Sequence, residues 1–458
     1  MNTLHNHQET LDWLFEQLGE SADIEYHESE SHGNEGQLLF VKSMVDDKKV
    51  QTSILVPFYN LDGLEQFVAY LYNLPSVKLF VSRDNTLDLI LDGHAALFFG
   101  KHMYLVDVKL VKNEQISEIS VEPTLQGPTN SLSENIMVNL NVLRGRYSRP
   151  SLKVEYWAVG TMSKTRLALV YDEQLVNPNT LMKVKEALNQ IQTDVIQAAG
   201  ELQRLLTKTK KGLFPTMIVT ERPDRVVYNL SHGKIAFLLQ GTPFALIAPA
   251  VFYDFMSSMD DFYVPYWVSR FLVFIRYIGL LATISLASLY VLVTSFNPEM
   301  VRVQLALSIA GSRAPVPYPS YFEVAFMLLM MELLTEASLR LPKSIGSTAT
   351  TVGGLILGQA ATQAGLVSNI MIIVVAAVAI SNYVVPIMEM SYGIRVAKYG
   401  ILVITSLFGL MGLVAGLLAL LAYIVRLDSF GEPYFKLFIE KPEKAHKASR
   451  GKNNSGGA

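Results

Sequence analysis

The pattern of hydrophobic and polar positions divides the chain into two parts. Up to about residue 265, short apolar runs alternate with charged residues, whereas residues 344–388 and 399–425 contain no Asp, Glu, Lys or Arg. A water-soluble chain rarely leaves such long stretches uncharged, so the pattern excludes a purely soluble protein. The expected fold class is therefore a soluble α/β amino-terminal region in two subdomains, followed by an all-α polytopic membrane domain.

The first subdomain is expected to combine short strands with one or two helices. Helical spacing of apolar residues is found at 10–19 and 62–74. Strand-like segments occupy 36–42, 51–57, 77–81, 87–91, 95–99 and 102–110. An acidic run between Leu4 and Gln37 is interpreted as a solvated helix face with its flanking loop, in preference to a cation or partner surface.

A second α/β subdomain follows a stretch that contains proline and glycine. Its expected helices are 133–147 and 178–206, and its expected strands are 153–158, 167–171, 234–239 and 244–248, the last two joined by a hairpin turn. The expected organisation is a first subdomain at 1–116, a linker at 117–132, a second subdomain at 133–265, a transmembrane domain at 266–427 and a basic, partly disordered tail at 428–458.

Composition narrows the chemistry. A net charge of -3 gives no sign of nucleic-acid binding, and the lack of cysteine excludes disulfides, thiolate zinc sites, iron–sulfur clusters and a cysteine nucleophile. The segment from Gly160 to Thr165 ends in Lys-Thr like a phosphate-binding loop but lacks the glycine before the lysine, so a turn between strands is preferred. With no catalytic triad or metal-ligand spacing in sight, we expect neither an enzyme nor a cofactor.

The second half contains several segments of membrane-spanning length. They occupy 277–296, 321–341, 349–366, 370–387 and 400–425. Five spans would place the termini on opposite sides, yet Arg270 and Arg276, the basic tail and the missing signal-peptide pattern favour both ends inside the cell. One segment must therefore be re-entrant or interfacial, or residues 301–313 must also enter the membrane.

Segment 321–341 is apolar but charged along one stripe. Glu332, Glu336 and Arg340 follow one another at intervals of four, on one side of a helix that would be costly to expose to lipid. Either Glu336 and Arg340 form a structural pair inside a helical bundle, or the helix lines an aqueous pore built by several subunits. Gln359 and Gln363 need interhelical or pore-water partners. The candidate pore-lining residues are Glu332, Glu336, Gln359 and Gln363.

Glycines spaced by four residues predict close helix contacts. They form the pairs Gly354 with Gly358 and Gly412 with Gly416. Because such faces let backbones approach one another, we expect the membrane half to assemble into a ring of copies.

Several ordered motifs between about residues 120 and 434 resemble a known family. The most specific are Thr220-Glu221-Arg222-Pro223-Asp224-Arg225, Gly241-Thr242-Pro243-Phe244, Asn297-Pro298-Glu299-Met300, Arg340-Leu341-Pro342-Lys343 and Gly358-Gln359-Ala360-Ala361. In this order they resemble the A subunits of bacterial spore germinant receptors, the GerA family. The chain departs from the family at Ala314-Pro315, where members often carry an acidic residue.

The resemblance implies a location, partners and a function. Such A subunits lie in the spore inner membrane, a cell membrane crossed several times, with the amino-terminal domain in the spore core. Their partners are a transporter-like B subunit, a lipoprotein C subunit, membrane lipid and further copies of themselves in a pentamer. The assembly would release monovalent cations when nutrients bind. An accessory GerA-like subunit associated with dipicolinate release, or a non-conducting scaffold, are the alternatives.

Overall fold

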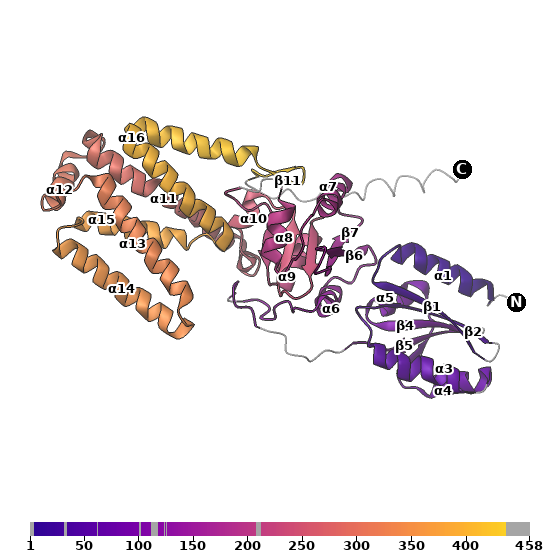
Figure 1. Ribbon diagram of the computed structural model, residues 1–458. Coiled ribbons are helices and arrows are strands. Elements are labelled where there is room, and N and C mark those ends of the chain that lie inside the picture. Colours follow the sequence, from indigo (N-terminus) through magenta and orange to yellow (C-terminus); the bar gives the residue numbers. More distant parts are fainter. Residues whose placement is uncertain are drawn as a thin grey trace.

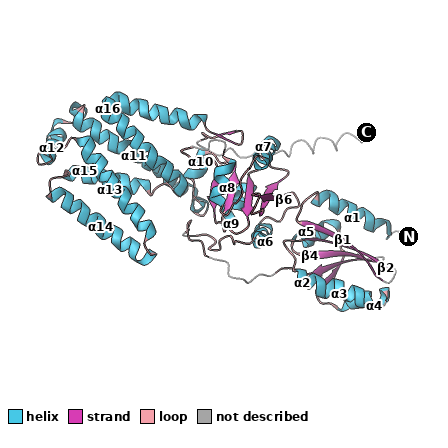
Figure 2. Cartoon of the chain, viewed as in Figure 1, coloured by secondary structure: helices cyan, strands magenta, loops and turns pink. Residues whose placement is uncertain are grey.

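The computed structural model describes residues 4–31, 34–61, 63–99, 102–110, 118–122, 124, 126–207 and 212–436. Within them, two α/β units, each with a five-stranded antiparallel sheet, precede a region of long helices (Figure 1). Colouring by secondary structure shows helices packed with the two sheets in the first half and mostly helices in the second (Figure 2). An α/β region followed by a helical region with apolar helices confirms the predicted fold class. The predicted tail from 437 onward lies outside the described residues.

The first unit contains a sheet of order β1-β2-β4-β5-β3. Its elements are α1 (Leu4–Leu18), β1 (Ile24–Ser31), β2 (Asn34–Val41), α2 (Asp47–Val50), a π-helical turn (Gln51–Leu55), α3 (Val56–Asn60), α4 (Leu64–Asn73), β3 (Val77–Leu79), α5 (Arg83–Leu91), β4 (His94–Phe99) and β5 (His102–Asp107). Part of the acidic run forms the edge strand β1, whereas a loop was expected there. Charged side chains suit such an edge because they oppose pairing with another chain.

Two predicted strands of the first unit are helical. Residues 51–57 continue the helix that Asp46 caps, because its side chain accepts a hydrogen bond from the amide of Lys48. Residues 87–91 belong to α5, where the hydroxyl of Ser82 accepts the amide of Asn85. Such N-caps satisfy the first free amides of a helix and outweigh strand propensity in short segments.

The second unit repeats the sheet arrangement in the order β6-β7-β9-β10-β8. Its elements are α6 (Ile136–Arg146), β6 (Leu152–Val159), β7 (Thr165–Asp172), α7 (Pro178–Asn189), α8 (Ala199–Leu206), β8 (Ile218–Thr220), α9 (Pro223–Leu230), β9 (Ile235–Leu239), β10 (Ala245–Ala248), α10 (Phe252–Met256) and a 3-10 turn (Met259–Phe262). The predicted helix at 178–206 is interrupted, because the carbonyls of Thr193 and Asp194 accept the amides of Thr161 and Met162. These bonds hold the turn between β6 and β7.

The two units meet through a buried polar contact. Arg144 of α6 and Asp23 before β1 are both almost completely buried, and the guanidinium Nε lies 3.2 Å from the carboxylate. The hydroxyl of Ser43 donates to the same carboxylate at 2.6 Å. Lys153 of β6 reaches into the first unit, where its Nζ donates to the carbonyl of Leu18 at 2.7 Å.

The helical region follows the second unit. Its helices are α11 (Tyr266–Ser295), a 3-10 turn (Pro298–Met300), α12 (Val303–Arg313), α13 (Ser320–Arg340), α14 (Lys343–Gln363), α15 (Asn369–Asn382) and α16 (Met388–Arg426). Within the described residues, α11 and α16 are long and apolar enough to cross a membrane, and α15 is a shorter apolar helix. The segment at 301–313, which the sequence left open, is the separate helix α12.

Helix α16 is a hairpin of two arms. Gly409 has a left-handed φ of 58° that breaks the helix, and a β-carbon there would lie 2.9 Å from Phe296 at the end of α11. The arms turn back on each other, since a β-carbon on Gly416 would meet Ile401 at 3.3 Å. The chain thus runs out and back where the sequence analysis counted one segment, 400–425.

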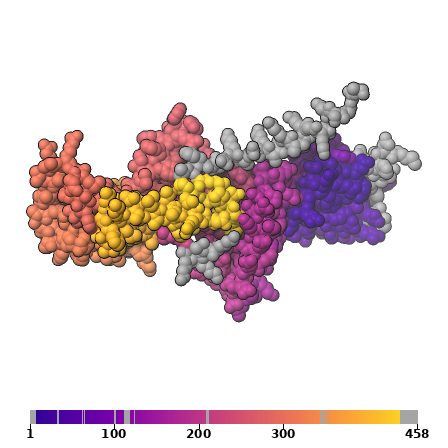
Figure 3. Space-filling view, turned by 90° about the horizontal axis from the view of Figure 1, so that it is seen from above, coloured from indigo at the N-terminus to yellow at the C-terminus, as the bar shows by residue number. Residues whose placement is uncertain are grey.

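The hairpin returns the chain to the second unit. Beyond α16, a two-residue ladder joins β11 (Asp428–Ser429) to β12 (Glu432–Pro433). The hydroxyl of Ser429 donates to the carbonyl of Thr216 at 2.7 Å, and the amide of Phe252 donates to the carbonyl of Tyr434 at 2.8 Å. In the space-filling view the yellow end of α16 accordingly meets the magenta second unit (Figure 3).

Candidate functional site

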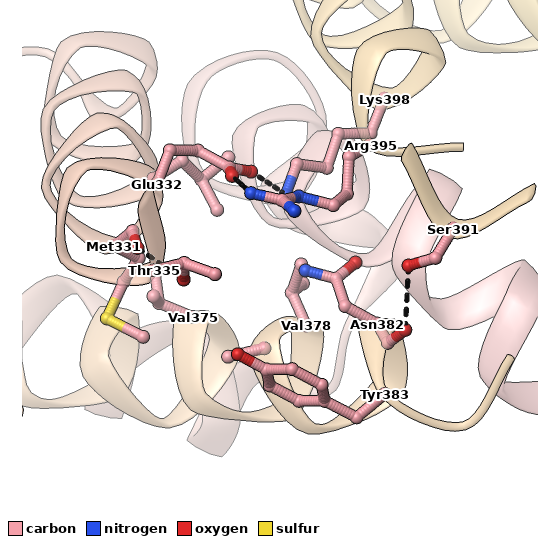
Figure 4. Close-up of a pocket in the computed structure, with 12 residues that line it drawn as sticks. Met331, Glu332, Thr335, Val375, Val378, Asn382, Tyr383, Ser391, Arg395 and Lys398 are labelled. Carbon is pink, nitrogen blue, oxygen red and sulfur yellow. Dashed lines mark hydrogen bonds and ion pairs between the residues drawn. The ribbon is translucent and has the colours of Figure 1, made fainter. Parts of the chain in front are cut away.

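A small polar pocket lies inside the helical region, between α13, α15 and α16 (Figure 4). It encloses about 40 Å³. Its apolar lining consists of Leu328, Met331, Val375, Val378 and Ala379, and its polar lining consists of Glu332, Thr335, Asn382, Tyr383, Ser391, Arg395 and Lys398. We regard these charged and amide groups on three apolar helices as a candidate functional site. Burying polar groups among apolar side chains costs free energy, so such groups commonly have a functional role.

The centre of the pocket is an ion triad between α13 and α16. The carboxylate of Glu332 binds the guanidinium of Arg395 through one oxygen and the ammonium of Lys398, at 2.9 Å, through the other. The Lys398 side chain is 3% exposed, whereas Glu332 and Arg395 are about one-fifth exposed, at 22% and 19%. One carboxylate therefore serves two cations, and it links two helices that are far apart in the sequence.

Uncharged polar groups complete the pocket on the opposite side. The hydroxyl of Ser391 donates to the backbone carbonyl of Asn382 at 3.1 Å, which joins the start of α16 to the end of α15. The Asn382 side chain points into the space below the triad (Figure 4). Its Oδ1 is buried and makes no hydrogen bond to any described residue. The amide of Asn382 is thus available to a small occupant of the pocket.

The structure separates the predicted site residues into two groups. Glu332 lines the pocket, whereas Glu336 and Arg340 form an ion pair at 2.8 Å on the exposed side of α13, with side chains 60% and 78% exposed. Gln359 and Gln363 are exposed on α14. The pore-lining role of these residues stays a prediction. What the sequence analysis missed is the pair of cations on α16.

A signal for Arg395 and Lys398 was present in the sequence. They lie between the two uncharged stretches and are three residues apart, on one side of a helix. Basic residues at that place are ordinarily interpreted as flanking a membrane span, so their pairing with Glu332 was not expected.

The small-residue faces are used for contacts within the chain. β-Carbons on Gly353 and Gly354 would meet Leu334 of α13 at 3.1 and 3.5 Å, and one on Gly358 would meet Ile372 of α15 at 3.8 Å. These glycines therefore let α14 approach its own neighbours. Assembly through such faces stays a prediction.

The motif from Thr220 to Arg225 joins the linker to the second unit. One oxygen of the Glu221 carboxylate accepts the backbone amides of Ser120 and Glu122, at 2.7 and 3.1 Å. Arg225 lies 3.2 Å from the Glu122 carboxylate and donates to the carbonyl of Asp254. Buried carboxylate and guanidinium groups satisfied in this way fix the path of the linker. The motif thus has a structural explanation.

In the part of the chain that the structure describes, two sheets of like order are joined to a helical region that contains a charged pocket and two helices apolar and long enough to cross a membrane. A comparison with known families identifies the family. Residues 12–450 match the Bacillus/Clostridium GerA spore germination protein family, and the chain belongs to that family. The resemblance seen in the sequence motifs is confirmed, and with it membership of the germinant receptor A subunits.

Individual relatives match most of the chain. Spore germination protein KA of Bacillus subtilis is 31% identical over 91% of this chain and 79% of its own length. Spore germination protein GerLA of Bacillus cereus is 36% identical over 68% of this chain and 64% of its own length. The uncharacterized membrane protein YfkQ of Bacillus subtilis is 30% identical over 87% of this chain and 79% of its own length.

A solved structure is also similar. It is the N-terminal domain of the A subunit of the Bacillus megaterium spore germinant receptor GerK3, with 24% sequence identity and a TM-score of 0.41. The similarity covers 54% of this chain and 95% of that domain.

Proposed function

We propose that this chain is a multi-pass membrane subunit of a nutrient germinant receptor and assembles with further copies into a channel that releases monovalent cations from the spore. One observation carries the proposal. The outer surface of α13 and α14 mixes polar groups, namely Glu336, Arg340, Gln359 and Gln363, with exposed apolar side chains such as Leu333, Leu355 and Ile356.

This mixed face is unsuited to a lone chain in lipid. Charged and amide side chains exposed to hydrocarbon are costly, so the face must be covered by protein or water. If copies form a ring with α13 and α14 toward its axis, the polar groups line an aqueous path and the apolar ones pack between neighbours. Glu332 would then lie outside the aqueous path, on the inner side of α13, where Arg395 and Lys398 already neutralise its charge.

The α16 hairpin supports a membrane arrangement with both ends on one side. α11, α13, α14, α15 and the two arms of α16 would cross in alternate directions, an even number of passes. The start of α13 contacts the end of α11 through Ser320 and Ser295, and Gly365 after α14 approaches Pro315 before α13. Both α/β units and the carboxyl end would then face the spore core, where family membership suggests B and C subunits as partners.

A non-conducting scaffold is the second candidate. It is favoured by the pairing of both acids of the α13 stripe, Glu332 and Glu336, with basic residues. A neutralised stripe gives little cation selectivity, so in the channel the amides of Gln359 and Gln363 would be the groups nearest the ion.

The experiment is cation efflux from vesicles that contain the purified full-length chain, alone and with B and C subunits. Changing Gln359 and Gln363 together to Leu should lower potassium efflux severalfold without changing crosslinked oligomers. Gln359→Asn, which keeps the amide, is the matched control. Oligomers that pass no potassium in any combination would favour the scaffold, and a chain that stays monomeric in native membranes would overturn the proposal.

A further inference from the structure

The pocket between α13, α15 and α16 has an unbalanced charge. Among the described residues that line it, Glu332 is acidic and Arg395 and Lys398 are basic. Both basic groups bind the one carboxylate, so a positive charge remains in excess. We propose that the pocket binds a small monovalent anion, of the size of chloride, which neutralises this excess. The proposal concerns the fold of the subunit and does not require that the subunit conduct ions.

Side chains around the triad offset the excess only in part. Lys398 Nζ lies 5.1 Å from the centre of the Tyr399 ring, and the Arg395 guanidinium lies 5.5 Å from the centre of the Tyr392 ring. Such cation–π contacts contribute about 0.5–2 kcal/mol each, less than a full counter-charge supplies at a buried site. Removing a charge from water remains costly without a counter-ion, and Lys398 is almost completely buried.

The pocket has the size and the donors for one small ion. Its volume of about 40 Å³ fits a halide or a few waters and is too small to enclose an organic acid or a lipid headgroup. Arg395 has guanidinium protons beyond those given to Glu332, and the amide of Asn382 borders the same space. The hydroxyl of Thr335 also borders it, but its proton is donated to the backbone carbonyl of Met331 at 2.8 Å. An anion between Arg395 and Asn382 would accept hydrogen bonds from the remaining guanidinium protons and from the Nδ2 group of the amide.

The excess charge of the pocket can be changed stepwise by mutation, which allows a test on the full-length protein purified in detergent. Thermal unfolding is followed in potassium chloride and in potassium gluconate at equal ionic strength, because gluconate is too large for the pocket. A ligand that binds only the folded state raises the melting temperature with its concentration. The wild type should therefore melt several degrees higher in chloride than in gluconate.

Two variants change the excess charge in opposite directions. Lys398→Met removes the excess, so the difference between chloride and gluconate should disappear. Glu332→Gln doubles the excess positive charge, so the difference in melting temperature between chloride and gluconate should grow. The stabilisation by chloride should also saturate at a severalfold lower chloride concentration. Arg340→Met is the control, because this exposed cation lies outside the pocket. Its melting temperatures in chloride and gluconate should differ by as much as those of the wild type.

Two results would overturn the proposal: an equal chloride response in the wild type and Lys398→Met, or stabilisation by gluconate as strong as by chloride. If Lys398→Met does not fold, Arg395→Gln makes the same charge change at a less buried position. Crystals of the wild type grown in bromide supply an independent measurement. An anomalous peak between Arg395 and Asn382 is expected, and a pocket without one would contradict the anion site.

Discussion

Arg144 and Asp23 form an ion pair between the two α/β units with both side chains almost entirely removed from solvent. Removing one partner of such a pair leaves the other charge buried and uncompensated, which typically costs about 3–5 kcal/mol. Arg144→Met should therefore lower the free energy of unfolding by about that amount, measured by chemical denaturation. It should also expose the junction between the units to limited proteolysis.

Two further variants control for this effect. Arg144→Met combined with Asp23→Asn should recover part of the loss, because no lone charge remains. Arg83→Met breaks the exposed pair with Glu9, whose side chain is 61% exposed, and should cost less than about 1 kcal/mol. Equal losses from Arg83→Met and Arg144→Met would mean that burial does not set the strength of the Asp23 pair.

We expect the stability of the first unit to depend on pH through the imidazole of His94, at the start of β4. Burial lowers its pKa below the ordinary value of 6.5, and the carboxylate of Asp107 offsets this only in part. As the pH falls through this range, the unfolded chain binds a proton that the folded chain does not, so stability falls on acidification. We expect the melting temperature of the first unit to drop between about pH 7 and pH 5.

Replacing the imidazole tests this assignment. His94→Gln cannot titrate and should flatten the slope of stability against pH in that range. His102→Gln, at an exposed position of β5, should keep the wild-type slope. A slope that survives in His94→Gln would assign the dependence to another group.

Gly409 is expected to be essential for the hairpin of α16. A left-handed φ costs other residues about 1–2 kcal/mol, and a β-carbon there would also press on Phe296. Gly409→Ala should therefore destabilise the protein by at least that amount. Gly400→Ala lies in a helical stretch with open space around the glycine and should be neutral or stabilising by about 0.5–1 kcal/mol.

The absence of native cysteine makes the hairpin measurable. Cysteines at Ile401 and Gly416 should form a disulfide readily, because a β-carbon on Gly416 would lie 3.7 Å from the Cα of Ile401. Adding Gly409→Ala should slow this crosslink. A straight α16 would hold these positions too far apart and give no crosslink in either background.

Tyr434 should be a major contributor to the packing of the carboxyl end. Its side chain is fully buried, with ring centres 6.4 Å from Phe252 and 6.1 Å from Phe255. Tyr434→Ala should cost about 3–5 kcal/mol. Tyr434→Phe should be neutral or stabilising in thermal denaturation, because the hydroxyl is buried without a hydrogen-bond partner among the described residues.

Regular patterns made much of the fold predictable. Strands such as β6, β7 and β9 were predicted within a few residues, because long apolar runs bounded by turns indicate buried strands. The strand predicted at 87–91 was wrong for a physical reason. Leu87, Leu89 and Leu91 alternate as in a strand, but the cap at Ser82 begins a helix that buries Leu87, Ile90 and Leu91.

Only the part of the pocket that lies on α13 was predictable from the sequence. The stripe on α13 marked Glu332, because a repeat of four along a helix can be read directly. Its partners Arg395 and Lys398 lie on another helix, and their approach depends on how α13 and α16 pack. The hairpin depends in turn on the backbone angle of Gly409, one glycine among many. Pairings of this kind follow from tertiary structure rather than from local pattern.

The return of the chain to the second unit has a consequence for the order of folding. The core of that unit contains Ile247 and Phe252 together with Ile424, Leu427 and Tyr434, which are synthesised only at the end of the helical region or just after it. Contacts so distant along the chain form late. The second unit, begun before the helical region, is thus completed only after it, and a chain whose α16 hairpin has not packed leaves an apolar surface open to proteases. A fault in the packing of this hairpin should therefore be detectable in the α/β half of the chain.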